Sequence, residues 1–369
     1  MRAWTELFRV SALFSVPGDA LAGAAAVGRG PGPGTALAIG ASLCLYEAGM
    51  ALNDWADREE DAVDRPHRPI PSGRISPPAA LGAAGALTAA GLALAARAGR
   101  PAVAVATGLA ATVWAYDLHL KHTKAGPAAM AAARSLDLLL GATATAHAGT
   151  GPGPAPRTAR PARGGPVPLT AAPDNAASPL RPALGALAAA LPAALVLGAH
   201  TYGVTAVSRH EAQGGSTAVP LAVLATTAAL GAIVLAAHRG RWPGEPATPG
   251  PGAPAPGGHR PLHPHETTTP TLQAAHGPTR PHHPTAPGAT HLLLTAFTGA
   301  YLRTAGPPLL HAALNPSPPL TQRAVGGGIR AMIPLQAALA GRAGAPGYGL
   351  AVMALAPLAR ALSRKVSPT

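Results

Sequence analysis

The sequence is poor in charged residues, in aromatic residues and in cysteine. Charged residues make up 12% and aromatic residues 3% of its 369 residues, whereas roughly 25% of an ordinary soluble domain is charged. So small a charged fraction does not cover a water-exposed surface of this size, which argues against a soluble protein. The one cysteine, Cys44, lies inside an apolar run. A disulfide scaffold and a cysteine-based metal site are therefore excluded.

The sequence contains long apolar runs. Ala, Leu and Val recur in blocks of about 20 residues, the helix length that crosses roughly 30 Å of hydrocarbon. The predicted spans are residues 10–28, 34–53, 77–97, 101–118, 127–148, 182–206, 217–237, 291–312, 324–342 and 346–363. The sequence therefore predicts an all-α, polytopic transmembrane helical bundle. The proline-broken stretch 291–323 leaves the count open between nine and ten spans.

Two polar stretches divide the chain. Residues 149–180 and 239–290 are rich in Pro, Gly, Thr and Arg and have no periodicity, so we expect two disordered inserts. They separate a first part of the bundle (1–148), a pair of helices around a polar loop (181–238) and the C-terminal helices (291–369). The histidines of the second insert are irregularly spaced and lack a carboxylate cluster, which favours a linker over a metal-binding tract.

The net charge of +13 is distributed in a way that points to lipid. The basic residues lie singly at the ends of apolar runs, without the aromatic interleaving typical of nucleic-acid binding. We therefore expect anionic membrane lipid as the partner and no nucleic acid. The short loops 54–76 and 119–126 fall on one side and carry several basic residues. The positive-inside rule predicts a multi-pass protein of the cell membrane with these loops in the cytoplasm.

The acidic residues are concentrated in one loop. Six of the fifteen lie between positions 54 and 64. Asn53, Asp57 and Asp61 follow at intervals of four, which on a helix stacks them on one face about 6 Å apart. Carboxylates so close repel one another and suit Mg²⁺, a hard cation that shares its coordination sites with phosphates. On the acids alone, a solvated loop balanced by its own arginines is an equally good interpretation.

The residues around this cluster resemble a known family. Residues 53–61 (NDWADREED) and the following 64–76 (DRPHRPIPSGRIS) are similar to the first aspartate-rich motif of the UbiA superfamily of intramembrane prenyltransferases. That motif reads N-D-x-x-D-x-x-x-D and is followed by R-P-I-P-S-G. Residues 116–121 (YDLHLK) resemble the tyrosine-to-lysine segment after the fourth helix, and Arg134 lies where the family often has an arginine. The resemblance spans most of the chain apart from the inserts.

The second motif of the family is reduced here. UbiA proteins normally carry D-x-x-x-D after the sixth helix, whereas residues 208–215 read SRHEAQGG and keep one carboxylate, Glu211. Together with the closing residues 365–369 (KVSPT), this loop is similar to the EboC-like branch of the superfamily. Glu211 is interpreted as a ligand of a second Mg²⁺ and Arg209 as a phosphate contact. A simple connecting loop is nearly as good an interpretation.

The resemblance implies transfer of an isoprenoid from a prenyl diphosphate to an unknown acceptor, with Mg²⁺ as cofactor and diphosphate released. The metal ligands it implies are Asn53, Asp54, Asp57, Asp61 and Glu211. The diphosphate-binding residues it implies are Asn53, Arg68, Lys121, Arg134 and Arg209. The catalytic residues it implies are Asp57, Asp61, Lys121 and Arg68. Two other functions stay open: an isoprenoid-binding accessory membrane protein that has lost catalysis, and a transporter, which the absence of repeated halves disfavours.

Overall fold

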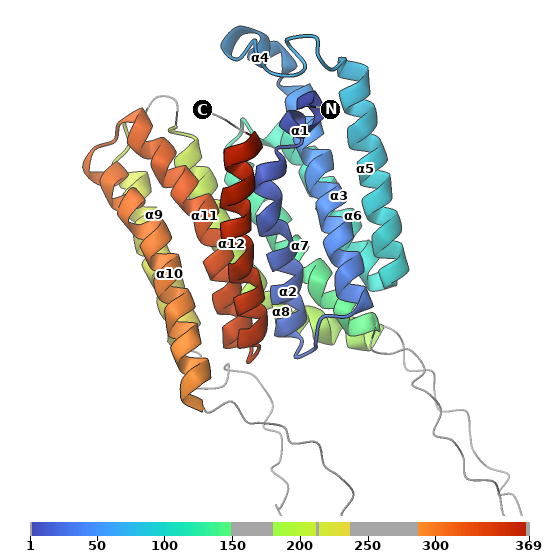
Figure 1. The fold of residues 1–369 in the computed structure, drawn as a ribbon, viewed down its shortest axis with the longest axis vertical. Coiled ribbons are helices and arrows are strands. Elements are labelled where there is room, and N and C mark those ends of the chain that lie inside the picture. Colours follow the sequence, from blue (N-terminus) through green and yellow to red (C-terminus); the bar gives the residue numbers. More distant parts are fainter. Residues whose placement is uncertain (1, 149–179, 212–213, 237–286, 367–369) are drawn as a thin grey trace, which may run out of the picture.

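The chain folds into a helical bundle. The computed structural model describes residues 2–148, 180–211, 214–236 and 287–366, and these residues contain helices and no strand (Figure 1). The bundle consists of α2 (Val16–Ala26), α3 (Pro33–Ala56), α5 (Pro77–Ala98), α6 (Arg100–Ala115), α7 (Gly126–Ala148), α8 (Leu180–Ser208), α9 (Ala218–Ala236), α10 (Pro287–Leu314), α11 (Pro318–Arg342) and α12 (Pro346–Val366). Shorter elements are α1 (Arg2–Leu7), the 3₁₀ helix η1 (Val10–Ser15), α4 (Arg58–Asp64) and the π-helix η2 (Tyr116–Leu120).

The expected all-α bundle is confirmed, and each of the ten predicted spans coincides with a bundle helix. The first predicted span is divided between η1 and α2. Helix α10 runs through Pro307 and Pro308 without ending, so the prolines that left the count open do not separate two spans.

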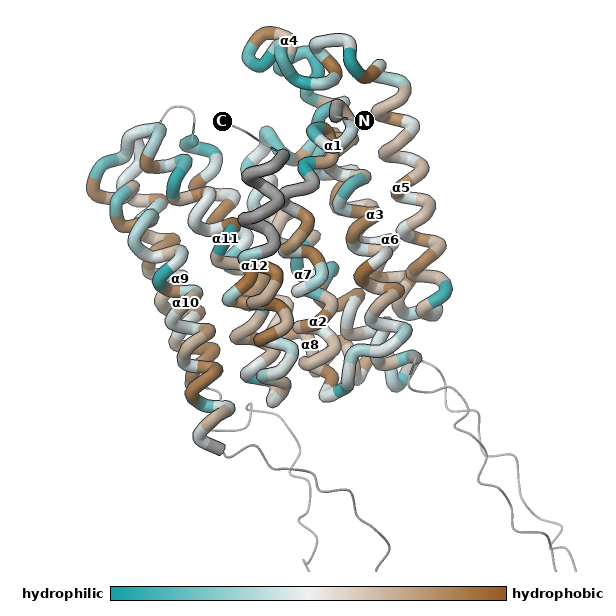
Figure 2. The backbone as a smooth tube through the Cα atoms, in the orientation of Figure 1, coloured by the Kyte–Doolittle hydropathy of each residue, from teal (hydrophilic) through white to brown (hydrophobic). Residues whose placement is uncertain are grey.

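Five stretches among the described residues are long and apolar enough by themselves to cross a membrane. They are Pro33–Ala56, Pro77–Ala98, Arg100–Leu120, Arg181–Ser208 and Ala218–Ala236. Figure 2 shows apolar residues along the bundle helices and polar residues gathered on α4 and its neighbouring loops. The protein is therefore a multi-pass membrane protein.

Small residues bring the helices close together. A Cβ atom built on Gly141 of α7 would lie 2.4 Å from the Cα of Ala20 in α2. A Cβ atom on Gly23 of α2 would lie 2.3 Å from the carbonyl oxygen of Leu138. Close backbone approach through Gly and Ala is how helices associate in lipid, where the hydrophobic effect does not drive them together. The α2–α7 contact therefore requires glycine at both positions.

The connections sort to the two ends of the bundle. Helix α4, η2 and the α8–α9 and α10–α11 connections lie at one end, here called the α4 end, together with both chain termini (Figure 1). Helices α7 and α9 finish, and α8 and α10 begin, at the opposite end. The expected inserts 149–180 and 239–290 therefore connect there, although nearly all of their residues lie outside the described part of the chain. Helix α10 begins at Pro287, slightly before the predicted boundary.

Candidate functional site

The acidic motif lies where α3 turns into α4. Helix α3 ends at Ala56 and α4 begins at Arg58, with Asp57 at the junction. The backbone N–H of Asp57 donates to the Asn53 carbonyl (2.9 Å), and the N–H of Asp61 donates to the Asp57 carbonyl (2.8 Å). Helical spacing thus continues across the junction, as the sequence predicts. Each of the three side chains nevertheless has a different partner.

Two cations bind the motif together. Lys121, which follows η2, forms an ion pair with Asp57. The Arg68 guanidinium lies 2.7 Å from a carboxylate oxygen of Asp61 and 3.2 Å from one of Asp54. Because Arg68 belongs to the R-P-I-P-S-G segment, that segment folds back over the acids that precede it. The structure therefore brings Asp54 and Asp61 together with Arg68, and Asp57 together with Lys121.

Burial makes this pairing necessary. The side chain of Asp61 is 1% exposed and that of Asp54 is 6% exposed. A buried carboxylate without a cation is strongly unfavourable, and Arg68 supplies the nearest cation to Asp61 and one of the two cations beside Asp54. Among the described residues the Oδ1 atom of Asp61 has no hydrogen-bond partner, and Arg65 Nε lies 3.6 Å from it. This oxygen is available to a further cation.

The same end of the bundle has the donor set that Mg²⁺ requires. Asp57, Glu60 and His122 each place one ligand atom within 4.8 Å of the others. Carboxylate oxygens are the ligands of this hard cation, and the unpartnered Asp61 oxygen belongs to the same motif. The residues present therefore fit Mg²⁺. Asp57 is the expected ligand that lies in this group, whereas Asp54 is turned toward Arg68.

Two residues of this site were not singled out from the sequence. Arg9 Nη2 lies 3.1 Å from Asp54 Oδ1, so Asp54 is shared between two guanidinium groups. Arg9 has φ 46° and ψ 48°, the left-handed region that non-glycine residues seldom occupy. Asn53 donates to Asp117 Oδ1 at 3.2 Å, and Asp117 is buried. Asp117 was signalled by its place beside Tyr116, but nothing in the sequence connects Arg9 to the acids.

The reduced second loop lies beside the first motif. Arg209 donates to the carbonyl oxygen of Thr123, two residues after Lys121. Burial raises the pKa of the Glu211 carboxyl, and the positive charge of Arg65 opposes that rise. The Glu211 carboxyl is therefore within electrostatic reach of the segment that follows α4. The expected proximity of this loop to the first motif is present.

The end of this loop, at Gly214 and Gly215, contacts the α10–α11 connection. Gly214 and Gly215 both have positive φ angles. The N–H of Gly215 donates to the carbonyl oxygen of Pro316 at 2.9 Å. A Cβ atom on Gly214 would lie 2.4 Å from the same oxygen. Glycine is therefore required for the contact between this loop and the α10–α11 connection.

Arg134 lies apart from these ion pairs. Its Nε atom is 3.0 Å from Asp19 Oδ2, on α2. The structure therefore places it in a different polar cluster, inside the bundle.

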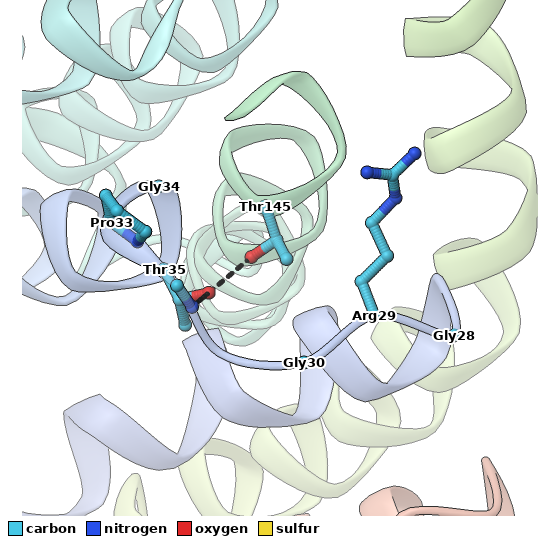
Figure 3. A pocket seen from close by; sticks show the side chains of 8 residues that line it. Gly28, Arg29, Gly30, Pro33, Gly34, Thr35 and Thr145 are labelled. Atoms are coloured by element: carbon cyan, nitrogen blue, oxygen red, sulfur yellow. Dashed lines mark hydrogen bonds between the residues drawn. The ribbon is translucent and has the colours of Figure 1, made fainter. Parts of the chain in front are cut away.

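A cavity of about 470 Å³ lies at the other end of the bundle. The α2–α3 connection and the end of α7 line it, and the hydroxyl groups of Thr35 and Thr145 are 2.8 Å apart there (Figure 3). Thr35 is at the start of α3, whereas the acidic motif is at its end. The cavity is therefore separate from the acidic site.

Comparison with known proteins identifies the family of the chain. The chain matches the UbiA prenyltransferase family over residues 16–237, more than half of its length. A digeranylgeranylglyceryl phosphate synthase from Methanopyrus kandleri is 39% identical over 129 residues, which cover 33% of this chain and 45% of that protein. The matches with such curated relatives span less than half of the relatives' lengths.

Two solved structures share the fold. The apo structure of a UbiA homologue from Aeropyrum pernix K1 has a TM-score of 0.51 and 16% identity, covering 86% of this chain and 96% of that one. A UbiA homologue from Archaeoglobus fulgidus, bound to DMAPP and Mg²⁺, has a TM-score of 0.50 and 16% identity, covering 95% and 99%. From its acidic motif, its bundle and these matches, the chain belongs to the UbiA prenyltransferase family.

Proposed function

We propose that this chain is a Mg²⁺-dependent intramembrane prenyltransferase, which moves an isoprenoid from a prenyl diphosphate to an acceptor and releases diphosphate. The observation that carries the proposal is the interlocked set of acids and cations at the α4 end, with Asp57 on Lys121 and Asp61 on Arg68. A purely solvated acidic loop has no need to bury Asp61 or to fold its arginine back over it.

Asp57, Glu60 and Asp61 are the residues that would hold Mg²⁺. Asn53 and Asp54 belong to the same motif and contact Asp117 and the two arginines Arg9 and Arg68. Bound there, the ion supplies Lewis-acid stabilisation of the charge on the departing diphosphate. Glu211 of the second loop, whose carboxyl is within electrostatic reach of Arg65, adds one carboxylate. This single acid supports placement in the EboC-like branch.

Lys121, Arg68 and Arg209 supply donors for the diphosphate oxygens. Charge-assisted hydrogen bonds to phosphate are the strong class, and donors fixed in advance favour the transition state in which charge develops. The ion pairs of Lys121 and Arg68 hold both side chains at this end before substrate arrives. The apolar bundle below binds the isoprenoid tail and keeps water from the allylic cation.

The relatives support the substrate class. Digeranylgeranylglyceryl phosphate synthases match part of the chain, and the Archaeoglobus fulgidus homologue is bound to DMAPP and Mg²⁺. We place the protein in the cell membrane, surrounded by anionic lipid and with the α4 end in the cytoplasm. An isoprenoid-binding accessory protein is the second candidate, favoured by the single carboxylate of the second loop.

The test uses the full chain purified in detergent, with geranyl diphosphate, Mg²⁺ and a membrane lipid extract. We expect diphosphate release that requires Mg²⁺ and is abolished in Asp57→Asn and Asp61→Asn, because an amide keeps the shape but loses the charge. Glu59→Gln is the matched control, since the Glu59 side chain is 87% exposed and, among the described residues, forms an ion pair with Arg58 alone. Turnover by the double Asp57→Asn/Asp61→Asn variant, or no release from the wild type, would contradict the enzyme and favour the accessory protein.

A further inference from the structure

Asp57, Glu60 and His122 form a group of side chains that the proposed function uses only in part. Asp57 lies at the α3–α4 junction, Glu60 is in α4, and His122 is in the connection between η2 and α7. Their ligand atoms all lie within 4.8 Å of one another. The group is here called the mixed triad, because it combines two carboxylates with an imidazole. The two acids serve the proposed Mg²⁺ site, whereas His122 has no role in it.

Contacts on both sides of His122 hold its backbone beside the acidic motif. Lys121, the residue before it, forms an ion pair with Asp57. The carbonyl oxygen of Thr123, the residue after it, accepts a hydrogen bond from Arg209. The His122 side chain itself is 69% exposed. The imidazole is therefore fixed next to Asp57 at its backbone and open to ions from solution at its ring.

Most ligand atoms of the mixed triad have no partner in the protein. In the described part of the chain, neither ring nitrogen of His122 makes a hydrogen bond, and Glu60 has neither a hydrogen bond nor an ion pair. Lys121 compensates the charge of Asp57. One carboxylate therefore stays uncompensated beside a free imidazole, and a divalent cation between them would satisfy both.

Polar side chains inside the bundle differ, because the protein supplies their partners. Both ring nitrogens of His200 are hydrogen-bonded, Nδ1 with the Tyr301 hydroxyl at 3.1 Å and Nε2 with a backbone carbonyl at 2.9 Å. The amide nitrogen of Gln336 donates to the Ser15 carbonyl at 2.7 Å and to Asp19 Oδ1 at 2.6 Å. These contacts join helices to one another. The mixed triad instead presents its ligand atoms at the surface of the α4 end.

An imidazole changes which ion such a group prefers. Mg²⁺ takes oxygen ligands, whereas imidazole suits Zn²⁺ and its transition-metal neighbours. Carboxylates accept both classes of ion, so Asp57 and Glu60 do not discriminate between them. His122 is therefore the member of the mixed triad that favours a transition metal.

The spacing of the mixed triad suits a single ion. Zn–N and Zn–O bonds of about 2.0–2.2 Å place two ligand atoms on one ion about 3–4 Å apart. Nε2 of His122 and Oδ1 of Asp57, which are 4.0 Å apart, already lie in this range. The remaining separations, up to 4.8 Å, close by rotation of the exposed Glu60 and His122 side chains. Three protein ligands with water in the fourth position are a common coordination of zinc.

We propose that Asp57, Glu60 and His122 bind a divalent transition metal of the Zn²⁺ class, with His122 as the ligand that distinguishes it from Mg²⁺. Because Asp57 and Glu60 are shared, this metal and Mg²⁺ exclude each other. The inference rests on the proposed function for this competition, and it adds a control of the same site by the ratio of the two ions. The metal site itself is tested by binding alone.

Metal binding by the full chain in detergent, without substrate, tests the inference. Co²⁺ is the probe, because its visible absorption reports the ligands of a site that Zn²⁺ also fills. We expect absorption bands that one equivalent of Zn²⁺ removes and that Mg²⁺ removes only in large excess. His122→Ala should weaken the binding of this equivalent at least about ten-fold, because losing even a group that supports a ligand costs about 10- to 100-fold. Its Mg²⁺ affinity, measured by calorimetry, should stay within about two-fold of wild type. His119→Ala is the matched control, since His119 is exposed on η2 and lies outside the mixed triad.

A second pair of variants addresses the shared acids, since Glu60→Gln should weaken the binding of both Co²⁺ and Mg²⁺ and Glu59→Gln should weaken neither. The bands assigned to the site are those that His122→Ala loses, so Co²⁺ bound by the histidines of residues 239–290 does not enter the comparison.

Equal Co²⁺ binding by the wild type and His122→Ala overturns the inference. An equal loss of Co²⁺ and Mg²⁺ affinity in His122→Ala also overturns it, as does Co²⁺ that excess Mg²⁺ does not displace. Diphosphate release from geranyl diphosphate is measured in parallel. If the binding pattern holds but no diphosphate is released, the proposed enzyme fails while the metal site stands. If Mg²⁺-dependent release occurs but Co²⁺ binding does not depend on His122, the metal site alone fails.

Discussion

Lys121 is the residue whose role the geometry defines most closely. Its side chain is 10% exposed and is held by Asp57. We expect Lys121→Met to lower kcat for prenyl transfer about 10²- to 10³-fold, the effect of removing one donor to developing charge. Steady-state kinetics with geranyl diphosphate would measure it. Loss of less than three-fold, in a protein of unchanged helix content, would show that Lys121 only neutralises Asp57.

Glu211 and Arg209 belong to one loop, but we expect their substitutions to cause different kinetic defects. Glu211→Gln should raise the Mg²⁺ concentration needed for half-maximal rate several-fold, because it removes the carboxylate that we propose as a ligand of a second Mg²⁺. Arg209→Ala should instead raise KM for the prenyl diphosphate several-fold, because it removes a phosphate donor. Titrations of metal and substrate separate the two effects. If both variants behave as wild type, the loop only connects α8 to α9.

The residue scale also shows where sequence reasoning reaches its limit. Asp57, Asp61 and Arg68 are close in sequence, so their spacing predicted a common site, and the structure brings them together. Arg9 contacts Asp54 across 45 positions, and no local pattern carries that information. Arg134 illustrates the opposite case. Its position in the family predicted that Arg134 binds the diphosphate. Its acidic partner in the structure is Asp19, which was not considered because it lies in the first apolar run.

At the scale of elements, hydropathy was sufficient to locate the helices but not their junctions. Runs of Ala and Leu predicted all ten bundle helices, because a membrane span is recognised by the length of its apolar stretch and does not require a periodic pattern of polar residues. The junction at Asp57 was not foreseen, since the spacing of four suits an unbroken helix. The π-helix η2 was not foreseen either, although it leads from α6 to Lys121. Such local departures depend on partners from other helices.

The α2–α7 contact provides the test at this scale. Gly141→Ala should lower the free energy of unfolding by about 1–3 kcal/mol, because its Cβ would overlap the backbone of Ala20. Gly85→Ala in α5 is the matched control, since a Cβ there meets nothing within 4 Å. It should be neutral or stabilising by up to about 1 kcal/mol, the helix propensity difference. Thermal unfolding in detergent compares them, and equal midpoints would contradict the close contact.

At the scale of the whole molecule, the site and the two inserts are at opposite ends. Deletion of residues 245–285 should leave membrane insertion and Mg²⁺-dependent diphosphate release within about two-fold of wild type. The physical reason is that α9 and α10 meet the insert far from the acidic motif, and its composition offers no core. Size-exclusion profiles and the release assay measure both properties. Loss of folded protein on deletion would show that the insert holds α9 and α10 together.

The hydrogen bond from Gln336 to the Ser15 carbonyl joins residues 321 positions apart. Its consequence concerns synthesis at the ribosome. At roughly 5–20 residues per second, the first helix enters the membrane about 16 to 64 s before its partner exists. Until then Asp19 can pair with Arg134 of α7 but lacks the hydrogen bond from Gln336. A chain interrupted before α11 therefore lacks the amide that joins Asp19 to the Ser15 carbonyl, a feature by which membrane quality control can distinguish truncated from finished copies.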